Sequence, residues 1–467
     1  MFAVRGFTAI VAGLVIHHHV LEVQGELTMT QVAGVPVYMN SQIGVQSAAQ
    51  SLVPSDWVVQ LPASWSDKQV QEFASNLTGQ ASVRFEGHPS ENGLSIVVIH
   101  ATFQELETLL ADHAGAEYVE QDYEVSATPE VALIEGLTEA LNSATTRVSE
   151  GIQINPPSWG LERIDQRDLP LGNSYMYEEQ AGSGVHVYVL DTGIRTTHKD
   201  FDGRAVPTLE SLEKGPVRCK TTDTGCAADH AGHGTHCAGT IAGSSYGVAK
   251  KATLHAVKVL SDSGTGSFSW LLAAIDWVMK EGQQPAVISA SLGCSSQCST
   301  RGVVQAIQAA HKSGVTVVVA AGNSNDDACK YGPPAAPSAL VVGSTTSQDA
   351  RSSFSNHGSC LDIFAPGSDI VSASHLSDTG SATMSGTSMA CPHVSGAAAL
   401  VLGRNARKSP DQVAESLIGC ASRSKVRDPI ARSPNLLLYS LPCTPQVISE
   451  ANITLRLRGS FQAQQFI

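Results

Sequence analysis

The sequence predicts an α/β protein with a parallel sheet flanked by helices, preceded by a small α+β domain. The chain has 467 residues, about two to three times the usual domain length, so we expect more than one folded unit. Hydrophobic residues make up 42% of the chain and charged residues 15%, which is a globular composition. Strand-like and helix-like patterns alternate over residues 158–443, and a shorter mixed pattern fills residues 55–127.

The segment 55–127 has the order strand, helix, strand, strand, helix, strand. The strands are expected at 57–61, 82–85, 94–99 and 117–125. Two capping boxes open the helices, one formed by Ser66 and Gln69 and the other by Thr102 and Glu105. This order predicts a split βαβ, or ferredoxin-like, domain.

In the larger unit, strands and helices alternate along the chain. Its strands are expected at 185–190, 253–260, 286–291 and 315–320. Its helices are expected after His233, over 268–280 and over 302–312. Strands that are separated by helices pair in parallel, so this pattern predicts a sheet with helices on both faces.

The segments that flank these units carry weaker signals. The apolar run 7–16 follows one arginine and predicts a signal peptide over residues 1–25, with a disordered N-terminus as the alternative. The remaining segments are a linker over 26–54, a linker and processing region over 128–157 with a short helix near Glu135, and a tail over 444–467.

Composition argues against several classes of function. Acidic residues outnumber basic ones, 43 to 29, so we expect no nucleic-acid partner. No apolar run reaches the roughly 18 residues of a membrane span, so we expect no stable membrane insertion. The ten cysteines lack the paired spacing of a zinc site. The signal peptide expected over residues 1–25 implies a secreted protein, and export would make most of the cysteines disulfides.

Four polar residues stand where catalytic groups are found in parallel α/β sheets, at strand ends and helix starts. Asp191 and Asn323 each follow an apolar strand, and His233 lies between a polar loop and an Ala/Gly-rich helix. Ser388 begins a long apolar helix. Pro392 is expected within the first turn of that helix, where its missing N–H costs little. Ser388 would then lie at the positive helix end, beside a developing oxyanion.

These residues lie in four segments that together resemble the subtilisin-like serine proteases, and in particular the proteinase K branch. The segments read VLDTGI from Val189, GHGTHCAGT from Gly232, AAGN from Ala320 and SGTSMA from Ser385. The resemblance covers nearly all of residues 158–443 and implies a subtilisin-like fold. It also implies a triad in which Asp191 orients His233, and His233 takes the proton of the Ser388 hydroxyl. Asn323 and the Ser388 backbone N–H would bind the oxyanion.

Two segments match the substrate-flanking strands of this family, which pair with an extended peptide. They are Gly264, Thr265 and Gly266, and Ser291, Leu292 and Gly293. The residues that would wall the pocket before the cut are Ala320, Ala321 and Gly322. No acidic residue stands among them, so we expect broad cleavage after apolar or aromatic residues. The alternative is that these glycines only mark loops.

The resemblance implies no cofactor for catalysis but a structural calcium ion. Pro337 and Ala339 align with carbonyl ligands of proteinase K, and Asp362 aligns with its carboxylate ligand. Such a set suits a hard cation, and the alternative is that Asp362 is an aspartate of a surface turn.

The resemblance also bears on the cysteines. Cys329 and Cys360 match a bridge of aqualysin-like relatives. Nearness in sequence suggests three further pairs, which are Cys219–Cys226, Cys294–Cys298 and Cys420–Cys443. Cys237 and Cys391 are expected to be buried free thiols. The histidines that we expect to be structural are His198, His236 and His393.

The 55–127 domain resembles the inhibitor propeptide of this family, whose closing strand leads into the active-site cleft. The resemblance implies a secreted, monomeric endopeptidase that acts on proteins and peptides and is made as a self-processing zymogen. Its own propeptide would inhibit it, and the first cut would fall near residues 126–131. The alternative is a self-processed protein that keeps its propeptide and acts as a binding protein, and the intact triad favours the enzyme.

Overall fold

The computed structural model describes residues 27–40, 54–127, 151–298 and 300–443. It also describes short strands at 10–11, 14–15, 21–22, 130–134 and 147–149. The tail over 444–467 and the helix expected near Glu135 lie outside these residues, as does most of the expected signal peptide. Within the described part of the chain, no helix is long and apolar enough to cross a membrane.

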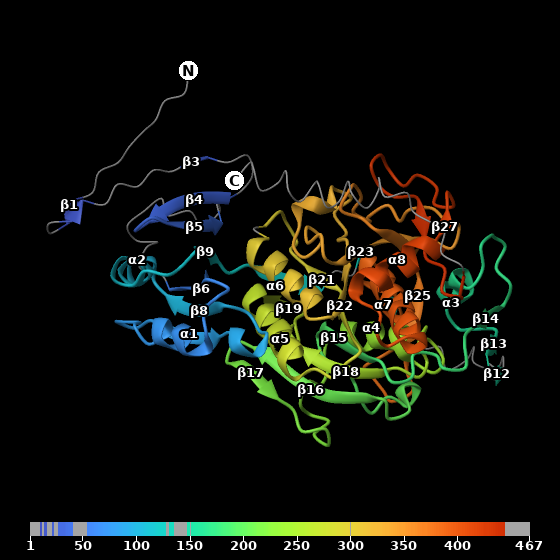
Figure 1. The fold of residues 1–467 in the computed structure, drawn as a ribbon. Helices are drawn as coiled ribbons and strands as arrows, with labels where there is room; N and C mark the ends of the chain where they lie inside the picture. Colours follow the sequence, from blue (N-terminus) through green and yellow to red (C-terminus); the bar gives the residue numbers. More distant parts are fainter. Residues whose placement is uncertain are drawn as a thin grey trace.

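The small unit is a sheet with two helices on one face (Figure 1). Its strands are β6 (Ser55–Gln60), β7 (Ser82–Glu86), β8 (Ile96–Ala101) and β9 (Tyr118–Gln121). Their spatial order is β9-β6-β8-β7, and all neighbours are antiparallel. Helices α1 (Asp67–Ala74) and α2 (Phe103–Asp112) start at the two predicted capping boxes. The expected ferredoxin-like order is confirmed.

The two faces of this sheet pack against different partners, because successive side chains of a strand point to opposite faces. Val59, Val97 and Ile99 pack under α1 and α2. Val58 and Val98 point the other way and join the core that surrounds two helices of the larger unit. The small unit is therefore docked through a buried apolar face.

Residues 27–40 form a hairpin of β4 (Leu27–Val32) and β5 (Val35–Asn40), where we expected part of a linker. Strand β5 pairs in parallel with β9, and β3 (Leu21–Glu22) pairs with β4, so the sheet of the small unit grows to seven strands. The linker prediction for 26–54 is wrong here. The edge of β9 needs a backbone partner, and the hairpin supplies it while burying Val37 and Met39.

The large unit is built on a ten-stranded sheet. Its order is β17 (Gly215–Arg218), β16 (Ala205–Leu212), β18 (Thr253–Lys258), β15 (His186–Asp191), β20 (Ala286–Ala290), β22 (Thr316–Ala320), β23 (Leu340–Thr345), β24 (Ile363–Pro366), β28 (Leu436–Leu437) and β27 (Ser422–Arg423). All neighbours from β16 to β28 are parallel, and the two edge strands are antiparallel. The predicted parallel sheet is confirmed.

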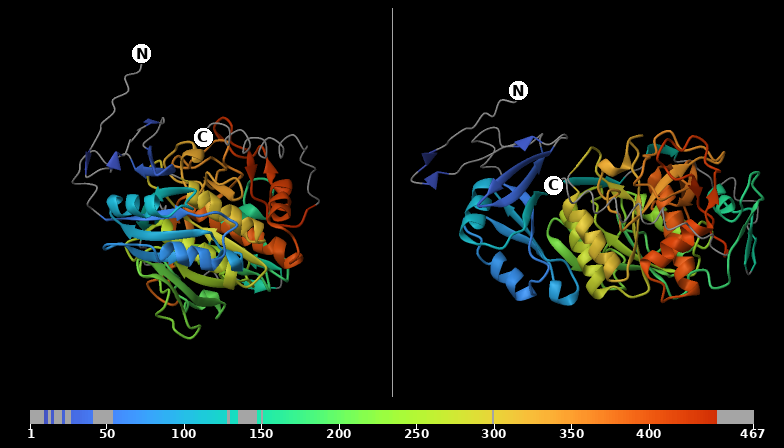
Figure 2. Two further views of the ribbon diagram at one scale, coloured as in Figure 1. Left: turned by 60° about the vertical axis from the view of Figure 1, so that its left-hand side comes forward. Right: turned by 45° about the horizontal axis from the view of Figure 1, so that its top comes forward.

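Helices cover both faces of this sheet (Figure 2). One face carries α4 (His233–Ala242), α7 (Thr387–Arg404) and α8 (Pro410–Cys420), and the other carries α5 (Phe268–Glu281) and α6 (Arg301–Lys312). Alternation along β15 shows the two layers, because Val187 and Val189 join the first core and Tyr188 and Leu190 the second. The small unit docks on α5 and α6 (Figure 1).

Carboxylates of the small unit cap both of the helices on which it docks. The Asp122 carboxylate accepts from Ser269 N at 3.0 Å, and Ser267 Oγ also donates to it, at the start of α5. The Glu120 carboxylate accepts from Gly302 N at 2.9 Å at the start of α6. Helix starts carry unpaired N–H groups and a positive potential, so these contacts offset part of the cost of burying the two carboxylates at the interface.

The connection between the units is also more regular than we expected. Strand β10 (Glu124–Ala127) and β11 (Glu130–Ile134) both pair with the large unit, and β12 (Arg147–Ser149) and β13 (Ile152–Ile154) form a small sheet with β14 (Ser174–Met176). The prediction of a linker over 128–157 is therefore wrong for β11, β12 and β13. The remaining short α-helix is α3 (Trp159–Ile164).

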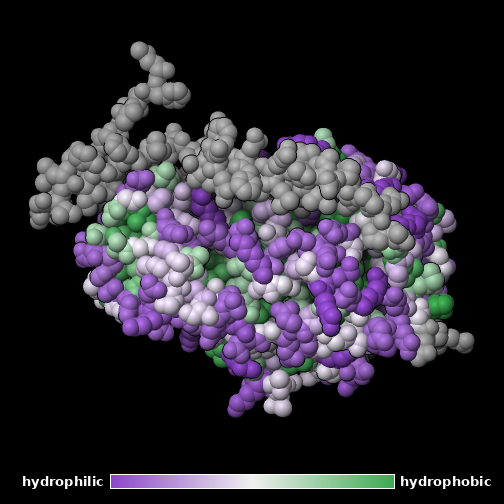
Figure 3. Space-filling view, viewed as in Figure 1, coloured by the Kyte–Doolittle hydropathy of each residue, from purple (hydrophilic) through white to green (hydrophobic). Residues whose placement is uncertain are grey.

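Hydrophilic side chains cover much of the described surface in the view of Figure 3.

Candidate active site

Asp191 and His233 meet at the carboxyl edge of the sheet. Asp191 is the last residue of β15, and His233 is the first residue of α4. The His233 Nδ1 lies 2.8 Å from the Asp191 Oδ1, which also accepts from Thr192 N at 2.7 Å. Asp191 has no solvent exposure, so its charge acts on the imidazole with little screening by water. This pair has the geometry of the base and its orienting acid.

The surroundings of His233 favour its charged form. Burial alone would lower the pKa of His233, but the charge of Asp191, the adjacent Cys237 thiol and the hydrogen bond to Asp191 raise it well above its usual value. The imidazolium that forms when His233 accepts a proton is therefore stabilised by its neighbours. Within the described part of the chain, Asp191, His233 and Cys237 are also the cluster whose side chains lie close enough to hold a metal ion.

Ser388 is the second residue of α7 and is fully buried. Its Oγ donates to the Ser291 carbonyl oxygen at 3.1 Å. The His233 Nε2 is buried and has no hydrogen-bond partner among the described residues, so the bond from Ser388 Oγ to His233 is not made in this arrangement. Catalytic hydrogen bonds are often long before substrate binds and tighten in the reactive complex.

Pro392 stands in the second turn of α7, not in the first, which corrects our placement of it. A proline there cannot donate to the carbonyl four residues earlier, and that carbonyl belongs to Ser388. The Ser388 carbonyl oxygen instead accepts from Ser291 Oγ at 3.0 Å and from Cys237 Sγ at 3.4 Å. Ser291 and Ser388 therefore bond each other in both directions, and the helix tolerates the proline.

Asn323 lies beyond the end of β22, beside the first turn of α7. Its Oδ1 accepts from Thr387 N at 2.9 Å and from Thr387 Oγ1 at 2.8 Å. The amide is thereby oriented by its oxygen, so its NH₂ is the end that could serve as a donor. Ala320 and Ala321 are buried just before it, and Gly322 has a φ of +95° and donates from its N–H to Thr387 Oγ1. The Asn323 side chain is thus bonded to Thr387, the residue that directly precedes Ser388.

The two expected substrate strands hold a third strand between them. Strand β19 (Thr265–Ser267) and β21 (Leu292–Gly293) both pair antiparallel with β10 from the small unit. Val125 lies opposite Gly266, and Ser126 lies opposite both Thr265 and Gly293. The Ala127 N–H donates to the Gly264 carbonyl at 2.9 Å. An extended stretch of the chain's own backbone therefore occupies the groove between these strands.

The chain continues on the other side of the candidate nucleophile. Strand β11 pairs antiparallel with β26 (Ser381–Ser385), which itself pairs with β25 (Ile370–Ala373), and Glu130 lies opposite Ser385. Ser385 is three residues before Ser388 in sequence. Residues 128–129, between the two strands, are not among those that the structure describes. The sequence carried no strong signal for β11, because this strand forms by pairing with β26, which lies far away in the sequence.

Two of the three expected calcium ligands lie just before neighbouring strands of the sheet. Ala339 directly precedes β23 and Asp362 directly precedes β24, and these two strands are neighbours. Asp362 exchanges bonds with Val341: its N–H donates to the Val341 carbonyl at 3.0 Å, and its Oδ2 accepts from Val341 N at 2.9 Å. Pro337 is exposed two residues before Ala339. One carboxylate beside backbone carbonyls is a donor set that fits a hard cation.

All four expected disulfides are present, and both remaining cysteines are buried free thiols. The bridges are Cys219–Cys226, Cys294–Cys298, Cys329–Cys360 and Cys420–Cys443. Cys237 has no solvent exposure, and burial raises the pKa of its thiol. It therefore stays protonated, and a protonated thiol is much less reactive than a thiolate.

The three histidines that we expected to be structural are hydrogen-bonded to backbone. His198 contacts the Gly380 carbonyl at 2.9 Å. His236 contacts the Ile370 carbonyl, and burial lowers its pKa to about 3. His393 contacts the Met389 carbonyl, and burial lowers its pKa to about 4. The last two are therefore neutral at ordinary pH and take no part in proton transfer.

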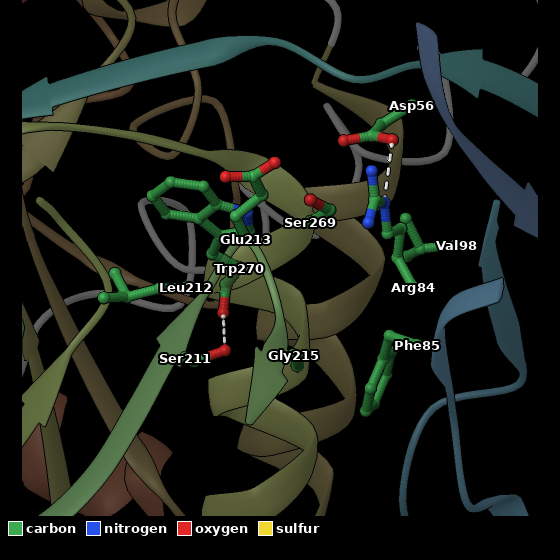
Figure 4. A pocket seen from close by; sticks show the side chains of 11 residues that line it. Asp56, Arg84, Phe85, Val98, Ser211, Leu212, Glu213, Gly215, Ser269 and Trp270 are labelled. Atoms are coloured by element: carbon green, nitrogen blue, oxygen red, sulfur yellow. Dashed lines mark hydrogen bonds and ion pairs between the residues drawn. The ribbon is translucent and has the colours of Figure 1, made fainter. Parts of the chain in front are cut away.

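A separate hollow lies at the junction of the two units (Figure 4). Asp56 and Arg84 line it from the small unit, and Glu213 and Trp270 from the large unit. In the view of Figure 4 an ion pair of 3.6 Å joins Asp56 to Arg84, and Ser211 donates to the Trp270 carbonyl. None of the triad candidates lines this hollow, and we read it as part of the docking interface.

Sequence reasoning missed two residues that bind the ends of the catalytic elements. Asp229 precedes α4 and accepts from the N–H groups of Gly232, which caps the helix, and Thr235 in its first turn, and Thr192 bridges Asp229 to that helix. The available signal was an acidic residue shortly before a helix start, where Asp is a preferred cap. Ser291 was expected only to contribute its backbone, whereas its hydroxyl also supports Ser388.

The fold and this site define a class of protein. An Asp–His pair beside a serine, each at the carboxyl edge of a parallel α/β sheet, is the arrangement of hydrolases that use a serine nucleophile. The model of the subtilase family of peptidases matches residues 182–434, which is more than half of the chain. The chain belongs to the subtilase family of serine proteases.

Known proteins show the same relationship. The chain is 50% identical over 287 residues to an extracellular serine proteinase of Thermus sp. (strain Rt41A), covering 61% of this chain and 67% of that one. It is 43% identical over 371 residues to alkaline serine exoprotease A of Vibrio alginolyticus, covering 79% and 63%. The chain thus spans about two thirds of the length of these relatives. A crystal structure of a cold-adapted subtilisin-like serine proteinase matches with a TM-score of 0.55 and 46% identity, covering 61% of this chain and 98% of that one.

Proposed function

We propose that this chain is a secreted serine endopeptidase made as a self-processing zymogen. One observation carries the proposal: two strands of the chain lie on either side of its own candidate nucleophile, with β10 in the groove between β19 and β21 and β11 on β26. A peptide substrate would bind in the same way, by adding a strand to these edges. The extracellular proteinase of Thermus supports export.

The reaction would follow from the geometry of the triad candidates. His233 takes the proton of the Ser388 hydroxyl as its oxygen attacks the carbonyl carbon before the cut, and Asp191 stabilises the imidazolium. The Asn323 side-chain NH₂ and the Ser388 N–H donate to the oxyanion that forms. His233 then gives its proton to the leaving amine, and water releases the acyl group from Ser388 by the same steps in reverse.

The position of the strands supports a first cut between Ala127 and Glu130. Ala127 lies opposite Leu292 on one side and Glu130 opposite Ser385 on the other, so we expect Ser388 to attack a bond between these two residues. After that cut, β10 would remain in the groove as a product and block substrate. The docked small unit would thus act as an inhibitor, because its sheet and two carboxylates bind α5 and α6.

We propose broad specificity with an apolar or aromatic preference, because no acidic residue stands in the segment 320–322 that precedes Asn323. We also propose that a calcium ion bound by Asp362 and the carbonyls of Pro337 and Ala339 stabilises the large unit. Such an ion would hold the starts of β23 and β24 together and would take no part in the chemistry.

The experiment is Ser388→Ala, expressed in a host without other processing proteases. Wild type should yield two parts of about 100 and about 340 residues, the lengths on either side of the expected cut after residues 1–25 are removed. Their formation should not depend on protein concentration, because the cut is intramolecular. The Ser388→Ala chain should accumulate uncut. Ser395→Ala, a buried serine further along α7, is the matched control and should process normally.

Two results would count against the proposal. A Ser388→Ala chain that still splits at this place would show that another protease makes the cut. A wild type that splits once and then hydrolyses no peptide, with both parts remaining bound, would support the alternative that the chain acts as a binding protein. Turnover of a short chromogenic peptide by the separated large part decides between the two.

A further inference from the structure

A buried carboxylate outside the triad binds the start of the helix that carries His233. Asp229 is 4% exposed and lies four residues before His233. Its Oδ1 accepts from Ala231 N at 3.0 Å and from Gly232 N at 2.7 Å. Its Oδ2 accepts from Thr235 N at 2.8 Å and from Thr235 Oγ1 at 2.6 Å. The Thr235 N–H belongs to the first turn of α4, where helix N–H groups lack partners within the helix, and Gly232 is the residue that caps it.

Thr192 connects this carboxylate to the strand that carries Asp191. Its Oγ1 donates to Asp229 Oδ1 at 2.8 Å and accepts from Gly234 N at 2.9 Å. Its own backbone N–H donates to Asp191 Oδ1 at 2.7 Å, the same oxygen that binds His233. One hydroxyl therefore links the end of β15, the start of α4 and Asp229.

The two elements also touch directly. A Cβ added at Gly234 would lie 2.1 Å from the Gly193 carbonyl oxygen and 3.2 Å from the Asp191 side chain, so helix and strand end meet without room for a side chain. At such a close approach, a small change in where α4 begins would alter the distance between the His233 ring and Asp191. Misplacement of a catalytic group by about 1 Å can cost on the order of a hundredfold in rate.

We propose that Asp229 and Thr192 are positioning residues for the triad, which hold the His233 imidazole at hydrogen-bond distance from Asp191. The inference rests on the proposed peptidase function. Neither side chain bonds a triad side chain in the structure: Asp229 acts through Thr192, Thr235 and the backbone just before α4, and Thr192 acts through its hydroxyl and its backbone. Their removal should therefore slow the chemical step and leave peptide binding, which uses β19 and β21, almost unchanged.

The test compares four single variants of the full chain after maturation, with active sites counted by a fluorophosphonate probe. Thr192→Val removes the linking hydroxyl at nearly constant volume, and Asp229→Asn replaces a carboxylate oxygen with an NH₂ that meets N–H donors. Thr192→Ser keeps the hydroxyl. Asp200→Asn is the matched control, because Asp200 is a buried carboxylate that accepts from Ser245 N at 2.7 Å beyond the far end of α4.

We expect Thr192→Val and Asp229→Asn each to lower kcat at least about tenfold, with KM within about twofold of wild type. Thr192→Ser should recover most of the loss, and Asp200→Asn should retain wild-type kcat whatever it does to the melting temperature. The Thr192→Val and Asp229→Asn effects on kcat should not add in the double variant, since both act through one set of bonds.

A folded Thr192→Val enzyme with wild-type kcat overturns the inference, and so does an equal loss in the Asp200→Asn control. If Asp229→Asn fails to fold, Thr192→Val and its Thr192→Ser counterpart decide alone. Failure of the proposed function looks different, because wild type itself would then hydrolyse no peptide, and the positioning role would fall with it.

Discussion

At the scale of single residues, one proline accounts for the hydrogen bonds between Ser291 and Ser388, the candidate nucleophile. Pro392 leaves the Ser388 carbonyl without its helical donor, and Ser291 Oγ takes that role while its own carbonyl accepts from Ser388 Oγ. Ser291, which we expect to supply backbone to the substrate groove, therefore also supports the start of α7. This connects the stability of the helix to the position of the candidate nucleophile.

Replacement of Ser291 tests that connection. Ser291→Ala removes the hydroxyl that donates to the buried Ser388 carbonyl, so the free energy of unfolding should fall by about 1 to 3 kcal/mol. Denaturant unfolding of the Ser388→Ala background, which avoids self-digestion, measures it. Ser313→Ala, which removes a hydroxyl bond to a carbonyl at the end of α6, serves as the control. Equal stability of Ser291→Ala and its background would refute the role.

Asn323 gives the second prediction at this scale. Asn323→Ala removes the amide whose oxygen is held by Thr387 and whose NH₂ would bind the oxyanion. We expect kcat to fall on the order of a hundred- to a thousandfold with little change in KM, a magnitude taken from the corresponding donor of subtilisin. Steady-state kinetics on a peptide substrate check this, with circular dichroism to confirm the fold. Unchanged kcat would mean that another group binds the oxyanion.

At the scale of elements, the hairpin of β4 and β5 extends the small unit onto the large one. The Tyr38 ring lies 4.1 Å from the Arg301 guanidinium at the start of α6, and Tyr118 OH donates to the Gln305 side chain at 2.8 Å. The hairpin thus adds a contact of its own beyond the ferredoxin-like core. It also covers the edge of β9, which would otherwise be exposed.

Loss of the Tyr38 ring should weaken docking of the small unit. A cation–π contact of this kind contributes roughly 0.5 to 1 kcal/mol, so Tyr38→Leu should speed release of the cleaved small unit by about two- to fivefold. The measurement is the lag before peptidase activity appears after the first cut. Gln31→Ala, an exposed position on β4, is the matched control. A Tyr38→Leu lag equal to that of wild type would contradict the contact.

At the scale of the whole molecule, two interface groups make docking depend on pH. Burial raises the pKa of Asp122 to about 6, against bonds from Ser267 and Ser269 that lower it. The hydrogen bond to Asp276 raises the pKa of His88 above its usual value, against burial, which lowers it. A group whose pKa is higher in the complex favours the complex when protonated. Both groups therefore stabilise docking at low pH.

The cleaved small unit should consequently bind more weakly as pH rises. The contribution of Asp122 is complete below about pH 4 and is lost as pH rises through about 6, and a pKa difference of about two corresponds to roughly a hundredfold in Kd. The contribution of His88 is complete below pH 6.5 and is lost at higher pH. Inhibition constants from pH 4 to 8 measure both. Asp122→Asn should flatten the lower window and His88→Gln the upper one, and tighter binding at high pH would contradict the assignment.

The proposed calcium site concerns the large unit as a whole. Excess chelator should lower its melting temperature by on the order of 5 to 10 °C if the ion is near saturation before chelation. Asp362→Asn should melt lower in calcium and should not respond further to chelator. The Ser388→Ala background prevents self-digestion during the scan. A wild-type melting temperature that ignores chelator would mean that Asp362 serves only its bonds to Val341.

The sequence alone determined the elements and the triad candidates, because hydrophobic periodicity, capping boxes and short motifs are local signals. The strands around β15, the ferredoxin-like order and the segments with Asp191, His233 and Ser388 could all be predicted in this way. The tertiary structure decided the rest: the second-turn place of Pro392, the hairpin on β9, the seat of β10 and β11 at the cleft, and the Asp229–Thr192 link. These features depend on hydrogen bonds between groups that are often far apart in the sequence. Buried backbone N–H and C=O groups need partners, and only the folded chain brings the two groups of each pair together.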